Sequence, residues 1–526
     1  MKNKVYIYDS TLRDGAQAQG ISFSVKDKIK IAQKLDEMGV DYIEAGNPSS
    51  NSKDMEFFKK VKELNFENSK LCAFGSTRRP NIKVEDDTAL KELLKAEVNT
   101  VAIFGKTWDF HVTDIIKTTL KENLAMVRES IEYLKSLNKE VIFDAEHFFD
   151  GYKSNKEYAI LVITEAKDAG ADSIVLCDTN GGTIPSEIHE IVSYLVKELK
   201  FENLGIHCHN DGGLAVANSL MAVQCGVNQV QGTFNGIGER CGNTNLTTVI
   251  ANLEFKMNYK TVLEEKLENL TAVSRYISEV SNIIPDDREP YVGAYAFAHK
   301  GGMHIDAVKK DSKSFEHLPP ETVGNERKIL MSEVSGRSTI MPIINKINLN
   351  IEKDSQETKR IINKLKKLEH EGYQFEGAES SFELLVRKEL GIFKPSFQLI
   401  EYKVITDKPS NTCHSALATI KLMVNGVMEV TAEAGNGPVN ALDKALRKAL
   451  SVFYKPISKM YLSDYKVRVI SGDKATSAKV RVIIESTDGV STWNTVGVSH
   501  DIIEASWEAL VDSVEYLLTN KLEEEK

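Results

Sequence analysis

The sequence lacks the features that mark secreted, membrane-spanning and nucleic-acid-binding proteins. Its six cysteines are scattered and form no CxxC pair, which argues against a disulfide framework and indicates a reducing compartment. No apolar run is long enough to span a bilayer, and no N-terminal stretch has the character of a signal peptide. No block of basic residues stands out and the net charge is −10, so neither nucleic acid nor a membrane is expected as a partner. We expect a cytoplasmic protein.

The first half of the chain alternates short apolar runs with amphipathic segments. The spacing of the runs, mostly about 25 to 35 residues, is typical of βα units. Eight such units predict an α/β fold with a (β/α)8 TIM barrel over residues 1–260. An open, doubly wound sheet is the structural alternative. The expected strands are 5–8, 42–45, 71–74, 100–104, 141–143, 173–176, 205–207 and 229–234.

The rest of the chain does not continue the regular alternation of apolar runs and amphipathic segments. Residues 261–395 read as helical linker and accessory subdomains, with an exposed Lys- and Glu-rich helix expected over 351–371. Residues 396–526 contain an internal repeat, because each half carries three strand-like segments followed by a helix. A βββα unit leaves one sheet face uncovered, so we expect the two units to pack together or across a homodimer.

Two histidines at the end of an apolar run indicate a metal site. His207 and His209 are two residues apart, and such side chains share one face of a strand. Asp14 follows the first strand and could add a carboxylate, since strand C-termini meet at one end of a barrel. Mixed His and Asp ligation suits Mg²⁺, Mn²⁺ or Zn²⁺, which could chelate a 2-oxo acid. The plainer interpretation is two core or loop histidines and an Asp-Gly turn.

Further candidates follow other strands. Asn243 ends a glycine-rich loop, Gly236–Asn243, and could be a ligand or a helix N-cap; the loop fails as a dinucleotide fingerprint. Glu146 could transfer a proton, although a surface carboxylate is the plainer interpretation. His304 could do so only if its loop folds back over the barrel mouth. Arg13 could steady negative charge, and Thr179 could bind a substrate carboxylate or belong to a simple turn.

Several motifs resemble those of the 2-isopropylmalate, homocitrate and citramalate synthases, a family of DRE-TIM metallolyases, over nearly the whole chain. The family motifs are Thr11–Gly15, Gly205–Asp211, Gly236–Asn243, Thr322–Asn325 and Ser335–Arg337. Three further segments resemble the citramalate branch and are less specific. They are Phe74–Arg79, Gly105–Trp108 and Asp144–Tyr152.

The resemblance implies an acyltransferase that condenses acetyl-CoA with pyruvate to citramalate for isoleucine biosynthesis. It implies a divalent metal on Asp14, His207, His209 and Asn243. Arg13 and Thr179 would then hold the oxo acid, while Glu146 and His304 transfer protons. The terminal repeat resembles the family's allosteric dimerisation domain, with isoleucine as the expected effector.

Three alternatives remain at this point. One is 2-isopropylmalate synthesis from 2-oxoisovalerate, for leucine. Another is an aldolase or lyase on the same barrel. The last is a catalytically silent amino-acid sensor, which the intact set of Asp14 and the two histidines argues against.

Overall fold

The computed structural model describes residues 3–329, 355–375, 377–407, 416–470, 478–489 and 491–524. The chain divides into two units. One consists of Met1–Phe297 with Leu318–Arg327, and the other of Ala298–His317 with Lys328–Lys526. The family motif Ser335–Arg337 lies outside the described residues. In the part that is described, no helix combines the length and the apolar character needed to cross a membrane.

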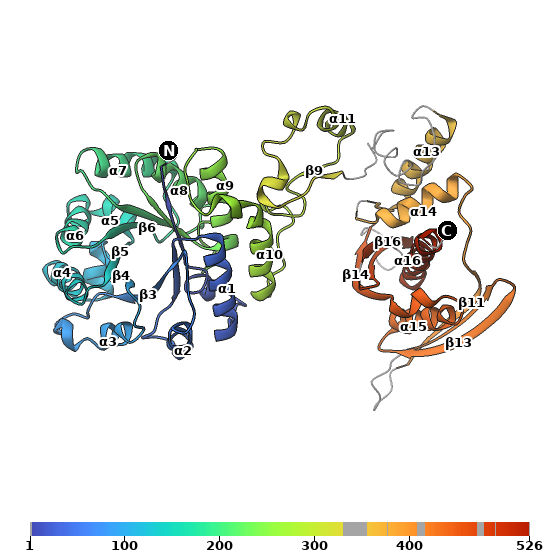
Figure 1. Cartoon of the computed structure of the whole chain (residues 1–526), viewed down its shortest axis with the longest axis horizontal. Coiled ribbons are helices and arrows are strands. Elements are labelled where there is room, and N and C mark those ends of the chain that lie inside the picture. Colours follow the sequence, from blue (N-terminus) through green and yellow to red (C-terminus); the bar gives the residue numbers. More distant parts are fainter. Residues whose placement is uncertain are drawn as a thin grey trace. The chain divides into compact units, whose positions relative to one another are not determined.

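The first unit is a closed barrel of eight parallel strands in sequence order (Figure 1). Strand β1 pairs with both β2 and β8, which closes the barrel and confirms the predicted (β/α)8 fold over the open sheet. The strands are β1 (Tyr6–Asp9), β2 (Tyr42–Gly46), β3 (Lys70–Ser76), β4 (Thr100–Lys106), β5 (Glu140–Glu146), β6 (Ser173–Asp178), β7 (Leu204–Cys208) and β8 (Gln229–Gly232).

Helices lie around the outside of the strands (Figure 1). They are α1 (Val25–Met38), α2 (Ser52–Val61), α3 (Thr88–Leu94), α4 (Leu120–Ser136), α5 (Phe148–Ser154), α6 (Lys156–Asp168), α7 (Pro185–Lys197), α8 (Ala215–Gln224), α9 (Leu246–Phe255) and α10 (Leu270–Val280). Local sequence sets their ends. Ser24 and Asp27 form a capping box at the start of α1. Gly39 ends α1 at φ +80°, where a Cβ would lie 2.5 Å from Leu263.

The second unit begins with a small parallel pair, β9 (Ala298–His299) and β10 (Lys328–Ile329), and helix α11 (Gly302–Lys310). Two helices follow, α13 (Gln356–Glu371) and α14 (Glu379–Glu389). Helix α13 agrees with the helix predicted over 351–371, of which 351–354 lie outside the described residues. It buries Ile361 and Leu365 and exposes most of its Lys and Glu residues.

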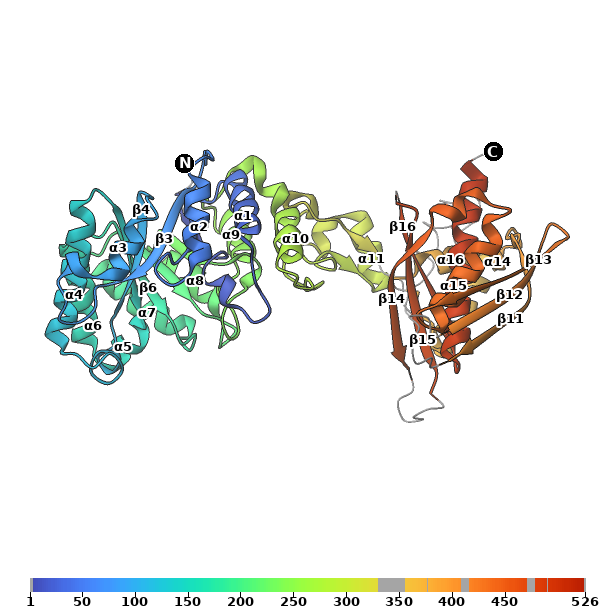
Figure 2. The same cartoon turned by 90° about the horizontal axis from the view of Figure 1, so that it is seen from below.

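The two predicted βββα repeats are confirmed. The first is β11 (Gln398–Thr406), β12 (Ala416–Val424), β13 (Val427–Gly435) and α15 (Pro438–Ser451); the second is β14 (Tyr461–Val469), β15 (Val480–Thr487), β16 (Thr492–Ser499) and α16 (Ile502–Glu524). Each forms an antiparallel three-stranded sheet. Helices α15 and α16 lie between the two sheets and share one apolar core with them (Figure 2).

Candidate functional site

Three of the predicted metal ligands meet at the C-terminal end of the barrel strands. The ligand atoms of Asp14, His207 and His209 all lie within 4.8 Å of one another, and the three residues are buried. Asp14 Oδ2 is 3.5 Å from His207 Nε2 and 4.0 Å from His209 Nε2. Strand β7 ends at Cys208, so the two imidazoles project from the strand end, as the HxH spacing predicts.

A tight turn after β1 presents Asp14. The backbone N–H groups of Arg13, Asp14 and Gly15 all donate to the carbonyl oxygen of Ser10, at 3.1, 2.9 and 3.0 Å. The Ser10 hydroxyl also accepts the Asp14 N–H at 3.2 Å. The turn therefore satisfies its own backbone groups and holds the carboxylate in the barrel mouth.

Two buried atoms beside this cluster have no hydrogen-bond partner among the described residues. They are His209 Nδ1 and the side-chain oxygen of Asn243. Backbone pairing holds Asn243 opposite His209. An unpaired buried acceptor is costly, and a cation would satisfy the side-chain oxygen of Asn243. One carboxylate, two imidazoles and an amide oxygen therefore fit a divalent cation.

Electrostatics favour an ionised Asp14. Burial raises the pKa of Asp14, but the charge of Arg13 and the two histidines outweigh it and hold the pKa well below its usual range. Burial and the neighbouring His207 lower the pKa of His209 to about 4, which keeps it neutral and able to ligate. For His207, burial lowers the pKa, but the hydrogen bond and charge of Asp14 give a net rise.

Arg13 is fixed from three sides. Its Nε is 2.5 Å from Glu44 Oε2, its Nη1 is 3.3 Å from Asp14 Oδ2, and its guanidinium lies 3.8 Å from the ring centre of Phe74. Glu44 is fully buried and also accepts hydrogen bonds from the hydroxyls of Tyr8 and Ser10. The guanidinium of Arg13 is thus held in place where it lines the pocket at the barrel mouth.

The three predicted metal ligands, Asp14, His207 and His209, line one pocket of about 220 Å³ together with Arg13, Glu146 and Thr179. Its full lining is Arg13, Asp14, Gln17, Phe74, Phe104, Asp144, Glu146, Cys177, Thr179, His207, His209, Glu239 and Arg240. Glu146 forms an ion pair with Lys106, its directly paired neighbour on β4. The Thr179 hydroxyl accepts the backbone N–H of His147 at 2.9 Å. Its own proton therefore remains available for a ligand in the pocket.

The comparisons with known proteins cover the whole chain. Residues 4–277 match the HMGL-like family, 291–373 the homocitrate synthase post-HMGL domain, and 376–518 the LeuA allosteric (dimerisation) domain. An (R)-citramalate synthase from Aquifex aeolicus is 54% identical, covering 100% of this chain and 99% of the relative. One from Geobacter sulfurreducens is 50% identical, covering 98% and 97%. A 2-isopropylmalate synthase from Methanocaldococcus jannaschii is 33% identical, covering 99% and 96%.

The chain belongs to the citramalate and 2-isopropylmalate synthase family. It is an acyltransferase of the DRE-TIM type, as its motifs predicted. Membership does not by itself assign roles to Asp14, Glu146 or the other site residues, so those roles remain predictions that the geometry supports.

One predicted site residue, His304, lies in the second unit and not in the barrel unit. His304 is on α11, exposed, and stacks on Phe315 with ring centres 3.9 Å apart. Its placement over the barrel mouth stays a prediction.

Sequence reasoning assigned no role to two residues that contact the pocket lining, Lys106 and Gln231. Lys106 ends a strand, and only the register of β4 against β5 pairs it with Glu146. Gln231 is a fully buried amide in β8, beside His207. The two glutamines of the short buried strand β8 were the available signal.

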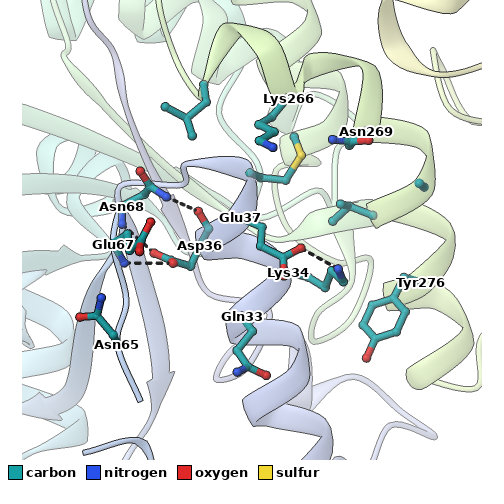
Figure 3. Close-up of a pocket in the computed structure, with 14 residues that line it drawn as sticks. Gln33, Lys34, Asp36, Glu37, Asn65, Glu67, Asn68, Lys266, Asn269 and Tyr276 are labelled. Atoms are coloured by element: carbon teal, nitrogen blue, oxygen red, sulfur yellow. Dashed lines mark hydrogen bonds and ion pairs between the residues drawn. The ribbon is translucent and has the colours of Figure 1, made fainter. Parts of the chain in front are cut away.

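A larger cavity, about 780 Å³, lies away from this chemistry (Figure 3). It is lined by the end of α1, the loop before β3, and α10 with the turn that precedes it. Three of its charged groups already have partners within the fold: Asp36 accepts three backbone N–H groups of residues 67–69, and Lys34 pairs with Glu37. Helix α1 ends where β2 begins, so this cavity is at the barrel end opposite the site.

Proposed function

We propose that this chain condenses acetyl-CoA with pyruvate and hydrolyses the thioester, giving citramalate and CoA. The observation that carries the proposal is the convergence of Asp14, His207 and His209 in one buried cluster beside Arg13. Full-length similarity to (R)-citramalate synthases supports the choice of substrates.

Asp14, His207, His209 and Asn243 would hold the divalent cation, which we expect to be Mg²⁺, Mn²⁺ or Zn²⁺. When bound, the cation would chelate the carboxylate and ketone oxygens of the oxo acid and polarise its carbonyl. Asp14, His207 and His209 all line the pocket, so a substrate bound in the pocket would lie next to the cation.

The chain's own residues would handle charge and protons. Glu146 would remove a proton from the acetyl methyl group, and the resulting carbanion would form a bond to the ketone carbon of pyruvate. Arg13 would stabilise the developing alkoxide, and Thr179 would donate its free hydroxyl proton to the pyruvate carboxylate. We assign protonation of the alkoxide to His304. Water then cleaves the thioester, so that CoA leaves as the thiol and the acetyl carbon becomes a carboxylate.

The shape of the pocket supports a small oxo acid. Phe74 and Phe104 form one wall, with ring centres 5.6 Å apart and planes 21° apart. The guanidinium of Arg13 covers the outer face of Phe74. A volume of about 220 Å³ leaves little space for a branched side chain in addition to a thioester. This favours pyruvate over 2-oxoisovalerate.

A second recess of about 220 Å³ is a candidate for the CoA arm. It shares Arg13, Gln17 and Phe74 with the first pocket, so the two adjoin. Polar groups of the β2–α2 loop line it, and so does the exposed Lys53 in the first turn of α2. An extended ligand could therefore reach from this recess to the metal site.

The terminal repeats support a homodimer, and we propose isoleucine as its effector. The outer face of the first sheet carries apolar side chains that the chain leaves open to solvent. Leu417, Met428 and Val430 are 43, 51 and 57% exposed. Such a face calls for a partner surface, and residues 376–518 match an allosteric dimerisation domain.

Thiol release from acetyl-CoA tests the reaction. The protein is assayed with Mg²⁺ or Mn²⁺ against pyruvate, glyoxylate, 2-oxobutyrate, 2-oxoisovalerate and 2-oxoglutarate. We expect the fastest turnover with pyruvate, loss of turnover with chelator and its return with added metal. Preference for 2-oxoisovalerate would instead indicate isopropylmalate synthesis, and wild-type turnover by Asp14→Ala would refute the metal site. Isoleucine added to the pyruvate reaction should then slow it.

A further inference from the structure

We infer that Gln231 and Asp144 are positioning residues that fix His207 in the one tautomer able to bind a cation. The inference rests on the proposed metal site, and it assigns a function to two buried polar residues that the proposed reaction does not use.

Strand register places Gln231 beside the histidine. Gln231 on β8 is the direct Cα partner of His207 on β7. Its side-chain oxygen lies 3.1 Å from His207 Nδ1, and its side-chain nitrogen donates to Asp144 Oδ1 at 3.1 Å. The exposed fractions are 0% for Gln231 and 4% for Asp144. Water therefore does not compete for these two bonds.

The chain of hydrogen bonds has a direction. Asp144 offers an acceptor oxygen to the amide whether or not its other oxygen carries a proton. The NH₂ end of Gln231 must then face Asp144, so its carbonyl end faces His207. A carbonyl accepts only from an N–H, which places the imidazole proton on Nδ1. The lone pair is left on Nε2, the nitrogen that points at Asp14 Oδ2.

A reversed amide would have the opposite effect. An NH₂ group beside Nδ1 would require a lone pair there and would move the proton to Nε2. That nitrogen could then donate to Asp14 but could not bind a cation. The contact with Asp144 therefore decides, through Gln231, whether His207 can act as a metal ligand.

The second histidine provides a contrast. His209 Nδ1 is buried and has no hydrogen-bond partner in the part of the chain that the structure describes. A bound cation would therefore select the tautomer of His209. The tautomer of His207 is fixed by Gln231 before a cation binds.

The test measures the Mn²⁺ affinity of the full chain without substrate. Chelator first removes any bound metal, and the concentration of free Mn²⁺ is then determined by EPR during a titration with Mn²⁺. Gln231→Leu removes both hydrogen bonds, and Asp144→Leu removes the group that orients the amide. Both should weaken Mn²⁺ binding by about 10–100-fold. Asp144→Asn keeps an acceptor oxygen and should bind within about 3-fold of wild type.

Gln229→Leu is the matched control. Gln229 is also buried in β8, two residues earlier and therefore on the same face, and it pairs with Gly205 rather than His207. Its loss should leave Mn²⁺ affinity unchanged. Circular dichroism checks that each variant is folded, and ¹⁵N-histidine spectra of the metal-free protein, recorded at a pH where His207 is neutral, should report an Nδ1–H tautomer for His207.

The outcomes separate this inference from the proposed function. Wild-type affinity in both Gln231→Leu and Asp144→Leu would overturn the inference and leave the metal site intact. Equal weakening in the Gln229→Leu control would also overturn it, because the effect would then be a general consequence of altering the barrel interior. No Mn²⁺ binding by the wild type, or undiminished binding by His207→Ala, would refute the metal site itself.

Discussion

Replacing Arg13 by methionine should destabilise the barrel by more than its lost packing. The Arg13 and Glu44 side chains are 12 and 0% exposed, and their atoms are 2.5 Å apart. Without the guanidinium, Glu44 is a buried carboxylate whose remaining donors among the described residues are the hydroxyls of Tyr8 and Ser10. Breaking one partner of a buried pair costs about 3–5 kcal/mol. We expect that loss in the free energy of unfolding of the barrel at pH 7.

A double variant separates charge from packing. Glu44→Gln removes the buried negative charge, while Arg13 keeps Asp14 as a partner at 3.3 Å. In Arg13→Met/Glu44→Gln residue 44 carries no charge, and Asp14 has lost its Arg13 partner just as in Arg13→Met alone. The double variant should therefore lose less than the sum of the two single variants, by roughly 1–3 kcal/mol.

Urea unfolding followed by tryptophan fluorescence measures these losses. Of the three tryptophans, only Trp108 is in the barrel unit, so all variants are made in a Trp493→Phe/Trp507→Phe background. Chelator is present throughout, because a bound metal would add to stability by mass action. Strictly additive losses, or a loss below about 1 kcal/mol in Arg13→Met, would refute the reasoning about the buried pair.

Three further predictions concern other parts of the chain. Gly238→Ala would place a methyl group 2.2 Å from the side-chain nitrogen of Asn243, and it should lower Mn²⁺ affinity about 10-fold. Gly182→Ala should not change the affinity, because no atom of the described residues lies near its Cβ. Val430→Asp should shift the dimer towards monomer in sedimentation analysis, and an unchanged distribution would exclude this sheet face as the interface. Burial raises the pKa of Asp9 to about 7, above an unfolded value of about 3.9, so its ionisation destabilises the fold as pH rises between these values. Asp9→Asn should therefore gain up to about 4 kcal/mol in unfolding free energy relative to wild type between pH 4 and pH 8, and a constant difference would contradict this.

The barrel could be predicted because its strands are buried and its units have a regular length. The elements that deviate depend on single backbone conformations. The run predicted as a strand over 229–234 ends at Gly232, and the left-handed conformation of Asn235 (φ +61°) turns the chain into the glycine-rich loop. Helix α5 begins after His147, which is also left-handed (φ +57°). Neither residue type requires that conformation, so the sequence alone did not predict it.

The metal cluster could be predicted for a different reason. Any parallel barrel brings its strand C-termini to one end, so Asp14 and the HxH pair had to come near each other once the fold was right. The contacts of Gln231 and Lys106 depend instead on which residues face each other across neighbouring strands. That register follows from the packing of the whole barrel and leaves no local pattern in the sequence.

The charges around the pocket provide a further argument for a cation. Three buried acidic side chains, Asp14, Glu44 and Asp144, lie around the mostly buried cation of Arg13. Burial and the neighbouring Glu44 raise the pKa of Asp144 to about 7, so the protein alone does not fully stabilise its negative charge. Unpaired acidic groups are seldom buried without compensation. A divalent cation between Asp14 and the two histidines would supply the missing positive charge. The electrostatics of the barrel mouth and the unpaired side-chain oxygen of Asn243 thus lead independently to the same proposed metal site.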